Sequence, residues 1–401
     1  MKHRLNYVLG FFIFIIALYA CNEKPTDVAY DLISDTVSIK IISHSDTNLI
    51  YGLEREIKSQ CAFNTDNFFI GKSNGTEVFS AIRFGYLPDS ISYIKESDIE
   101  SVTLSLFPGR YALGDTLSPN FGFSIKKVEN YWSSYANYDS LSAAGMLSYD
   151  IGSFEGEIDL LDTMKSLEIP LNKKIITDWL QRRTDTNAYI VNWGIALIPN
   201  SGSNVIHSFN GQGVGSVLLP GLKIVFQNKE NKKDTVNLDA AITCSFIKYP
   251  KFDDDKIVFQ GGLDVRTNLK FDLSMIPPFA GISKMDMQLT IDKENSIIGN
   301  LKQVEDFRID FLPDTNKKLF GSYYYYMEAS DTNLTKYYCP SITSAAELWN
   351  RNDGKGKLQV RGSDMESLYR RLDRYVFHGT NDADTNKRPK VRVIYTIRRQ
   401  R

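Results

Sequence analysis

The stretch that decides the fold is AIRFGYLPDSISYIKESDIESVTLSLF, residues 81–107, because a second version of it returns as NLKFDLSMIPPFAGISKMDMQLTI, residues 268–291. In each copy a short apolar segment leads to a proline and then to a segment in which apolar and polar residues alternate. Strict alternation puts one face on a core and the other in water, so each copy is predicted to be strand, crossover, strand. A repeat shared by the two halves indicates two related domains.

The composition agrees with two folded, strand-rich domains. Of the 401 residues, 42% are hydrophobic and 24% are charged, which excludes a wholly disordered chain. The chain has 22 tyrosines and 23 phenylalanines, and polar residues recur between its apolar runs. This mixture favours many strands joined by polar loops, so the predicted fold class is all-β. A net charge of −1 gives no indication of a nucleic-acid partner.

The N-terminal segment is predicted to be a targeting sequence. Lys2 and Arg4 precede the apolar run Val8–Ala20. As a helix this run is about 20 Å long, too short for a bilayer core of about 30 Å, so residues 1–20 are predicted to be a cleaved signal peptide. Leu18–Cys21 resembles the lipobox of bacterial lipoproteins, which implies that Cys21 is lipidated and anchors the chain to a membrane. Residues 21–36 are then a tether.

A charged segment is predicted to divide the remaining chain. Asn228–Asp234 has five charged residues in seven and no apolar one. We therefore expect a linker at 228–236, a first domain at 37–227 and a second domain at 237–401. One short helix is expected in each domain, at Asn172–Arg182 and at Asp364–Leu372, because apolar residues there recur at helical spacing.

The order of several motifs resembles that of DNRLRE-type domains. The motifs are the strand pair of residues 81–106, Trp132, the helix segment 167–179, a "Gl.L" strand at 194–197 and a terminal strand at 220–225. The resemblance implies two tandem jelly-roll-like β-sandwich domains of the carbohydrate-binding-module kind. It covers nearly all of residues 68–226 and, more weakly, 256–397. No "Gl.L" strand is recognised in the second copy, so the second domain is predicted to be reduced.

The sequence does not point to a catalytic or metal site. Gly71–Gly75 matches G-x-S-x-G, but the residues after it are strand-like, whereas a nucleophile elbow needs a helix there, so a turn is predicted. Asp253–Asp255 could supply carboxylates to calcium, but it lacks the interleaved spacing of a calcium loop and is predicted to be a solvated turn. Cys61, Cys244 and Cys339 lie in no metal-like spacing and are predicted to be buried, with a Cys244–Cys339 bridge left open. We expect no enzyme activity, no cofactor and no metal.

Two aromatic stretches could form a platform for a sugar, because the apolar face of a pyranose stacks on aromatic rings. One is the loop 130–139, where the predicted glycan-binding residues are Tyr131, Tyr135, Tyr138, Asn137 and Asp139. The other is Tyr323–Tyr326 with the neighbouring tyrosines 337 and 338. The alternative is that rings in a strand face the core and that Trp132 packs under the sandwich.

Six Asp-Ser/Thr-aliphatic triplets resemble the O-glycosylation site of exported Bacteroidetes proteins. Thr36, Thr116 and Thr235 are the predicted acceptors. Together with the lipobox, they predict a lipoprotein in the outer membrane that faces the periplasm or the cell surface. The leading hypothesis is that it binds a polysaccharide or has a structural role there. The alternative is a scaffold or accessory subunit that docks other envelope proteins.

Overall fold

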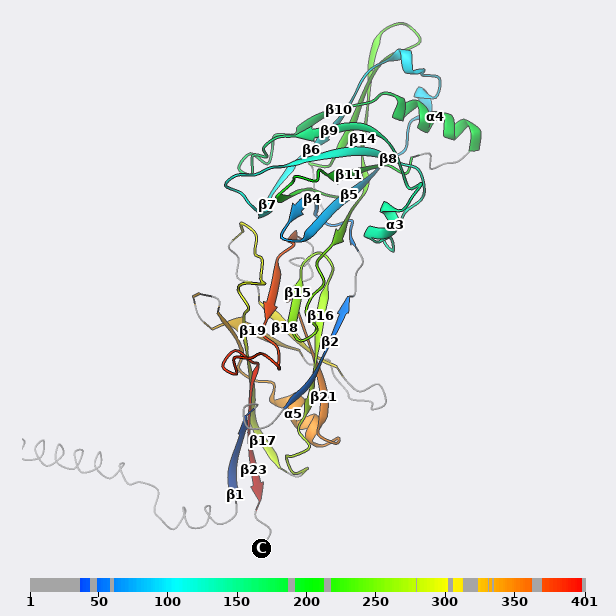
Figure 1. Cartoon of the computed structure of the whole chain (residues 1–401). Coiled ribbons are helices and arrows are strands. Elements are labelled where there is room, and N and C mark those ends of the chain that lie inside the picture. Colours follow the sequence, from blue (N-terminus) through cyan, green and yellow to red (C-terminus); the bar gives the residue numbers. More distant parts are fainter. Residues whose placement is uncertain are drawn as a thin grey trace, which may run out of the picture.

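The computed structural model describes residues 37–43, 49–57, 61–186, 192–212, 218–278, 280–301, 306–312, 324–330, 332–333, 335–362 and 370–398. They form two β-sandwich-like domains, one above the other in Figure 1. Cys21, the tether and Thr36 lie outside the described residues, as does most of the predicted helix Asp364–Leu372. None of the described helices is long and apolar enough to cross a membrane.

The first domain is a sheet of antiparallel pairs that folds over into two layers. One layer has the order β10-β6-β13-β14, and the other continues as β14-β5-β11-β8-β9, with β4, β7 and β12 beside it. The strands are β3 (Ala62–Phe63), β4 (Asn67–Ser73), β5 (Thr76–Phe84), β6 (Ile99–Leu106), β7 (Pro108–Gly114), β8 (Gly122–Val128), β9 (Leu147–Glu155), β10 (Leu167–Leu171), β11 (Ile195–Pro199), β12 (Val205–Asn210), β13 (Gly221–Gln227) and β14 (Lys233–Lys248). The helices are η1 (Asp89–Ile91), η2 (Glu96–Asp98), α3 (Tyr138–Ser142) and α4 (Lys174–Thr186).

The second domain repeats this arrangement with strands from both ends of the chain. Its order is β1-β23-β17-β20-β19-β18-β21-β16-β15-β22, and β2 pairs with β16. The elements are β1 (Val37–Ser43), β2 (Ile50–Ile57), β15 (Ile257–Gln260), β16 (Val265–Asp272), β17 (Gly281–Thr290), β18 (Phe307–Leu312), β19 (Tyr324–Ala329), β20 (Lys336–Cys339), α5 (Thr343–Asn350), β21 (Lys355–Gly362), β22 (Arg374–Phe377) and β23 (Lys390–Arg398).

The repeated strand pair is the frame of both domains, as the sequence predicts. In the first domain β5 and β6 lie in opposite layers, and their alternating apolar residues meet in one core with those of β8, β11, β13 and α4. In the second domain β16 and β17 do the same. The predicted helix Asn172–Arg182 is confirmed as α4, and its Trp179 is 1% exposed in the first core.

The predicted linker is a β-hairpin in the structure. Residues 228–232 form a turn. The N–H of Asn228 donates to the carbonyl of Lys232, and its carbonyl accepts from the N–H of Asn231. β14 then pairs with β13 from Lys233 onward. The charged residues are therefore on an exposed hairpin, not between domains. The first sheet continues to Lys248, while β1 and β2 belong to the second sheet. The expected ranges 37–227 and 237–401 are therefore wrong in two places. β1 and β2, expected in the first domain, belong to the second, and β14 extends the first domain to Lys248.

The second domain has counterparts of the helix and of the "Gl.L" strand of the first. Its counterpart of α4 is α5, which follows β20 as α4 follows β10, and Trp349 takes the place of Trp179 in the core. The counterpart of the "Gl.L" strand β11 is β21, because each lies beside the first strand of the repeat. The sequence predicts the helix of this domain at Asp364–Leu372, after β21, whereas α5 precedes β21, and this is why no "Gl.L" strand was recognised there.

A buried interface joins the two domains at a waist. The Tyr111 hydroxyl donates to Asp373 Oδ1 at 2.8 Å and accepts from the backbone N–H of Leu372 at 3.0 Å. Asn300 of the second domain donates to the carbonyl of Arg110 at 2.9 Å. Apolar side chains surround these bonds, namely Phe69, Val78, Leu113, Ile206 and Ile247 from the first domain and Val258, Leu263, Val265 and Val376 from the second. The interface holds the two domains in one relative orientation.

Candidate functional site

The predicted aromatic loop lies between β8 and α3 and presents only part of its rings to solvent. Tyr131 is 61% exposed and Tyr135 is 88% exposed. Trp132 is 3% exposed, donates its indole N–H to the carbonyl of Trp193 at 2.8 Å and packs edge-on against Phe246. The alternative reading of Trp132 as a core residue is therefore the one that the structure supports.

The other predicted residues of this loop have local roles. The Tyr138 ring packs edge-on against Phe79 at 5.0 Å. Burial, and then its hydrogen bond with Glu77, raises the pKa of Tyr138. Asn137 caps α3, because its side chain accepts from the backbone N–H of Ser140 at 2.8 Å. Asp139 is exposed in the first turn of α3. Of the five predicted residues, Tyr131, Tyr135 and Asp139 remain open to a ligand.

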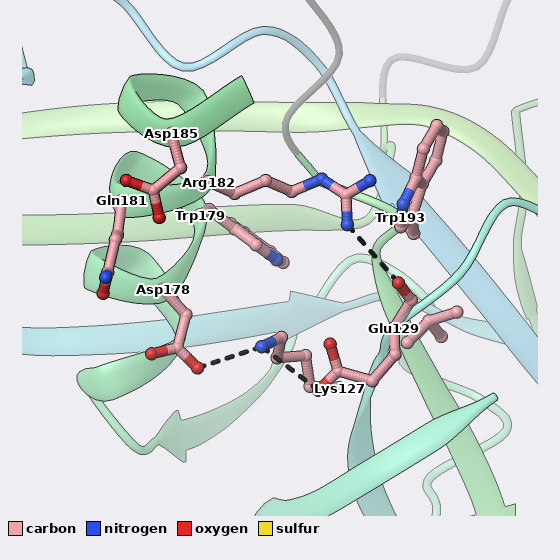
Figure 2. A pocket seen from close by; sticks show the side chains of 9 residues that line it. Lys127, Glu129, Asp178, Trp179, Gln181, Arg182, Asp185 and Trp193 are labelled. Carbon is pink, nitrogen blue, oxygen red and sulfur yellow. Dashed lines mark hydrogen bonds and ion pairs between the residues drawn. The ribbon is translucent and has the colours of Figure 1, made fainter. Parts of the chain in front are cut away.

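A polar cleft of about 380 Å³ lies beside this loop, between α4 and the end of β8 (Figure 2). It is lined by Lys127, Val128, Glu129, Asp178, Trp179, Gln181, Arg182, Asp185 and Trp193. One face of α4 supplies Asp178, Gln181, Arg182 and Asp185, since residues three or four apart share a helix face. The apolar stripe of the same helix faces the core.

Asp178 is the centre of the charge network on one wall. It accepts from Lys127 Nζ at 3.0 Å, from the Tyr149 hydroxyl at 2.8 Å and from Lys174 Nζ. Burial alone would raise the pKa of Asp178, but the hydrogen bonds from Lys174, Lys127 and Tyr149 outweigh it and lower that pKa. Asp178 is therefore an ionised acceptor at neutral pH.

Aromatic and guanidinium groups form the opposite rim. The Arg182 guanidinium lies 5.0 Å from the centroid of the half-buried Trp193 ring, and its Nη1 donates to the carbonyl of Glu129 at 3.4 Å. Tyr131 meets the Trp193 ring edge-on at 5.3 Å. The exposed loop and the cleft therefore share one rim, with Tyr131 on the loop side.

The floor carries a polar group with no partner among the described residues. Trp179 points from α4 toward the middle of the group in Figure 2, and its buried indole N–H makes no hydrogen bond within this part of the chain. The cleft thus combines carboxylates, cations, an indole N–H and ring faces. Sequence reasoning missed Trp193 as a site residue, and the left-handed conformation of the neighbouring Gly194 is visible only in the structure.

The second aromatic stretch forms a smaller exposed patch on β19. Tyr324 and Tyr326 are about half exposed and meet edge-on at 5.6 Å, and Arg308 stacks on Tyr324 at 4.3 Å. Tyr325 accepts from the backbone N–H of Ala345, and Tyr337 is fully buried. As expected for a strand, alternate rings face opposite sides. Tyr323 lies outside the described residues.

The remaining motifs have structural explanations. Gly71–Gly75 is the hairpin between β4 and β5, so the predicted turn is confirmed. Asp255 accepts from Asn381, and no cluster of three or more metal-ligating side chains occurs in the described part of the chain. Cys61, Cys244 and Cys339 are buried and form no disulfide, and Cys244 and Cys339 lie in different domains, so the structure does not form that bridge. Thr116 and Thr235 are exposed, the latter within β14.

Comparison with known proteins adds no family. No family model and no curated protein matches the sequence. Among solved structures, the chain is similar at 12% identity to one described as the structure of the Macrobrachium rosenbergii Nodavirus. The match covers 94% of this chain and 93% of that one, with a TM-score of 0.12, which is too low to indicate a shared fold.

Proposed function

We propose that this protein is a non-catalytic lipoprotein of the cell envelope that binds a glycan in the α4 cleft, on the rim formed by Trp193 and Tyr131, and on the exposed Tyr135 of the same loop. The observation that carries the proposal is the shared rim, where ring faces lie directly beside a polar cleft. Sugars need both features, because ring faces take the C–H surface of a pyranose and polar groups take its hydroxyls.

The charge network favours recognition over catalysis. Asp178 holds its charge through three hydrogen bonds, and Glu129 faces Lys127 at 3.2 Å. A general acid would need a raised pKa near the operating pH. The ionised Asp178, with its fixed partners, is instead suited to accept a hydroxyl hydrogen bond from a bound sugar.

The position of the cleft suits a protein anchored at its N-terminus. In Figure 1 β1 begins at the lower end of the second domain, while α4 lies at the upper end of the first. If Cys21 carries a lipid, the cleft faces away from the membrane. A Cys21→Ser variant should then leave the membrane fraction, and unchanged fractionation would exclude this anchor.

The glycan proposal is tested with a glycan array and then with matched variants. Tyr131→Ala with Tyr135→Ala should weaken binding of an array-selected glycan about fivefold or more per stacked ring, because each ring contributes about 1 kcal/mol. The melting temperature should hold, since both rings are exposed. Tyr324→Ala with Tyr326→Ala is the control on the second domain. Equal binding by all three proteins would exclude the cleft rim, and loss only in the control would move the site to β19.

A further inference from the structure

The two domains close their sandwiches at the same place in the fold with strands of different origin. In the first domain β14 pairs with β13 through its first half and with β5 through its second half. In the second domain β1 pairs with β23, the counterpart of β13, and β2 pairs with β16, the counterpart of β5. β1 and β2 therefore occupy the position of the two halves of β14.

The two closing strands differ in how they are held. β14 follows β13 through the turn at 228–232, so a local connection keeps it in place. β1 and β2 instead precede the whole first domain, and Val37 pairs with Arg398. Among the residues that the structure describes, no hairpin joins β1 to β23 or β2 to β16. Strand pairing, core packing and side-chain contacts therefore hold this N-terminal segment in the second domain.

The groove that accepts the segment is specific. Residues 37–43 make seven residue pairs with β23, and residues 50–57 make seven with β16. Leu49 and Ile50 enter the second core and are at most 2% exposed. Ion pairs fix the register, since Glu54 meets Lys270 and also Lys357, the latter at 3.6 Å.

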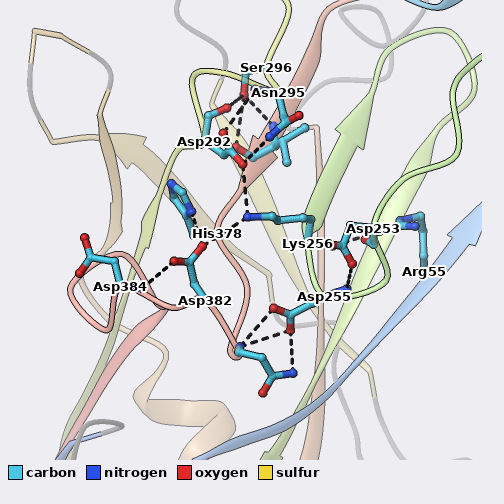
Figure 3. A network of polar contacts seen from close by, with 12 residues as sticks. Arg55, Asp253, Asp255, Lys256, Asp292, Asn295, Ser296, His378, Asp382 and Asp384 are labelled. Atoms are coloured by element: carbon cyan, nitrogen blue, oxygen red, sulfur yellow. Dashed lines mark hydrogen bonds and ion pairs between the residues drawn. The ribbon is translucent and has the colours of Figure 1, made fainter.

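A further contact secures the segment to the connection between the domains. Arg55 of β2 donates to the carbonyls of Asp253 and Lys256 at 2.7 and 3.1 Å, and its guanidinium stacks on Phe252 at 5.3 Å. Figure 3 shows this arginine beside Asp253, next to the network that links Lys256 with Asp292 and Asp382. Polar contacts thus link β2, the connection around Asp253–Lys256 and the residues that follow β22.

We propose that the groove between β16 and β23 is a strand-binding site whose partner in trans is the strands β1 and β2 of a second copy of this chain. The occupant is bound as an added strand, a mode in which backbone pairing supplies affinity and alternate side chains supply specificity. Release of the segment exposes both the groove and the donor strand on the same molecule. A second copy then offers the matching sequence, register and charges, which is the condition for strand exchange between protomers.

The first test uses the full chain with its own donor disabled. Ile50→Asp places a charge in the second core, so the segment should leave the groove. A fluorescent peptide of residues 37–57 should then bind this variant but not the wild-type chain, whose groove is occupied. The same peptide with Ile50→Asp should fail to bind, and a peptide with the exposed Tyr51 changed to Ser should bind normally. No binding by the variant chain would overturn the proposal.

The second test does not depend on a destabilised variant. Ile39 lies opposite Thr396 in the register, so a chain with Ile39→Cys and a chain with Thr396→Cys are unfolded, mixed and refolded together. Exchange in trans should produce an interchain disulfide whose yield rises with protein concentration, because the intramolecular strand competes with the second copy. The control pairs Ile39→Cys with Lys390→Cys, which lies at the other end of β23. A yield no higher than this control would overturn the proposal.

Discussion

The two domains differ most in the distance along the chain between the strands that close them. The first domain closes with β14, one short turn after β13, whereas the second closes with β1 and β2 from the far end of the chain. Loop-closure entropy makes the second arrangement harder to form, so the first domain should fold before the second. The same position in a sandwich can thus be filled by a strand that is near in the sequence or by strands that are far away in it. The first domain can complete its sheet without the N-terminal strands, whereas the second cannot.

The domains also differ in how they hold a histidine near equivalent strands. His207 in β12 is buried against Phe121, and neither of its ring nitrogens has a partner in the described structure. His378 follows β22 and contacts Asp382 at 2.6 Å, and Asp382 also meets Lys256. The first domain therefore buries a neutral ring where the second has a charged network.

The largest expected effect comes from two glycines that mark the counterpart strands β11 and β21. A Cβ at Gly194 would lie 1.9 Å from the carbonyl oxygen of Ile82, and one at Gly356 would lie 1.8 Å from the Trp349 ring. We expect Gly194→Ala and Gly356→Ala each to cost more than about 4 kcal/mol of unfolding free energy, measured by urea denaturation. Gly221→Ala in β13 is the control, because its nearest atom is 3.9 Å away. A Gly356→Ala protein as stable as the wild type would contradict the assignment of β21 as the counterpart of β11.

Acid should weaken the first domain before the second. Burial lowers the pKa of His207 to about 4 from an ordinary 6.5, so the unfolded state binds a proton that the folded state refuses. Stability should therefore fall by about 3 kcal/mol as the pH drops from 6.5 to 4. The hydrogen bond from His378 lowers the pKa of Asp382 to about 2, so its contribution is lost only between about pH 4 and 2.

Hydrogen exchange at pH 7 and pH 4.5 measures this difference domain by domain. His207→Leu should remove the loss in the first domain, while the second domain should keep its protection at both pH values. Equal weakening of both domains, or an unchanged pH dependence in His207→Leu, would contradict the assignment.

A smaller effect is expected at the waist, which couples the two domains. Tyr111→Phe removes the hydroxyl shared by Asp373 and Leu372, so the Leu372 N–H loses this acceptor, while Asp373 Oδ1 still accepts from the N–H of Gly299. The expected cost is about 1–3 kcal/mol of unfolding free energy. The buried N–H of Leu372 has then given up its hydrogen bond to water without gaining one in the protein. Tyr86→Phe is a matched control, since that hydroxyl is on the exposed surface and donates to Asp89 at 2.8 Å. If both substitutions cost the same in urea denaturation, the waist bond does not stabilise the pair of domains.

Local sequence patterns account for part of the candidate site. Trp132 could be predicted as core from its place among the motifs, and Tyr135 as exposed from its place in a polar loop. The roles of Asn137 and Tyr138 could not be predicted, because the cap of α3 and the contact with Phe79 depend on the position of the loop in the folded domain. Trp193 was missed because its role depends on contacts with Arg182 and Tyr131, which only the folded chain brings beside it.

The sequence by itself determined that this protein is built from strands, that one strand pair occurs twice and that α4 buries its apolar stripe. Those features follow from alternation and helical spacing, which act over a few residues. Only the tertiary structure decided that 228–232 is a hairpin, that β21 completes the second copy and that β1 and β2 belong to the second domain. The physical reason is that alternation specifies which face of a strand is buried, while its neighbour is selected by the packing and pairing of residues far apart in the chain.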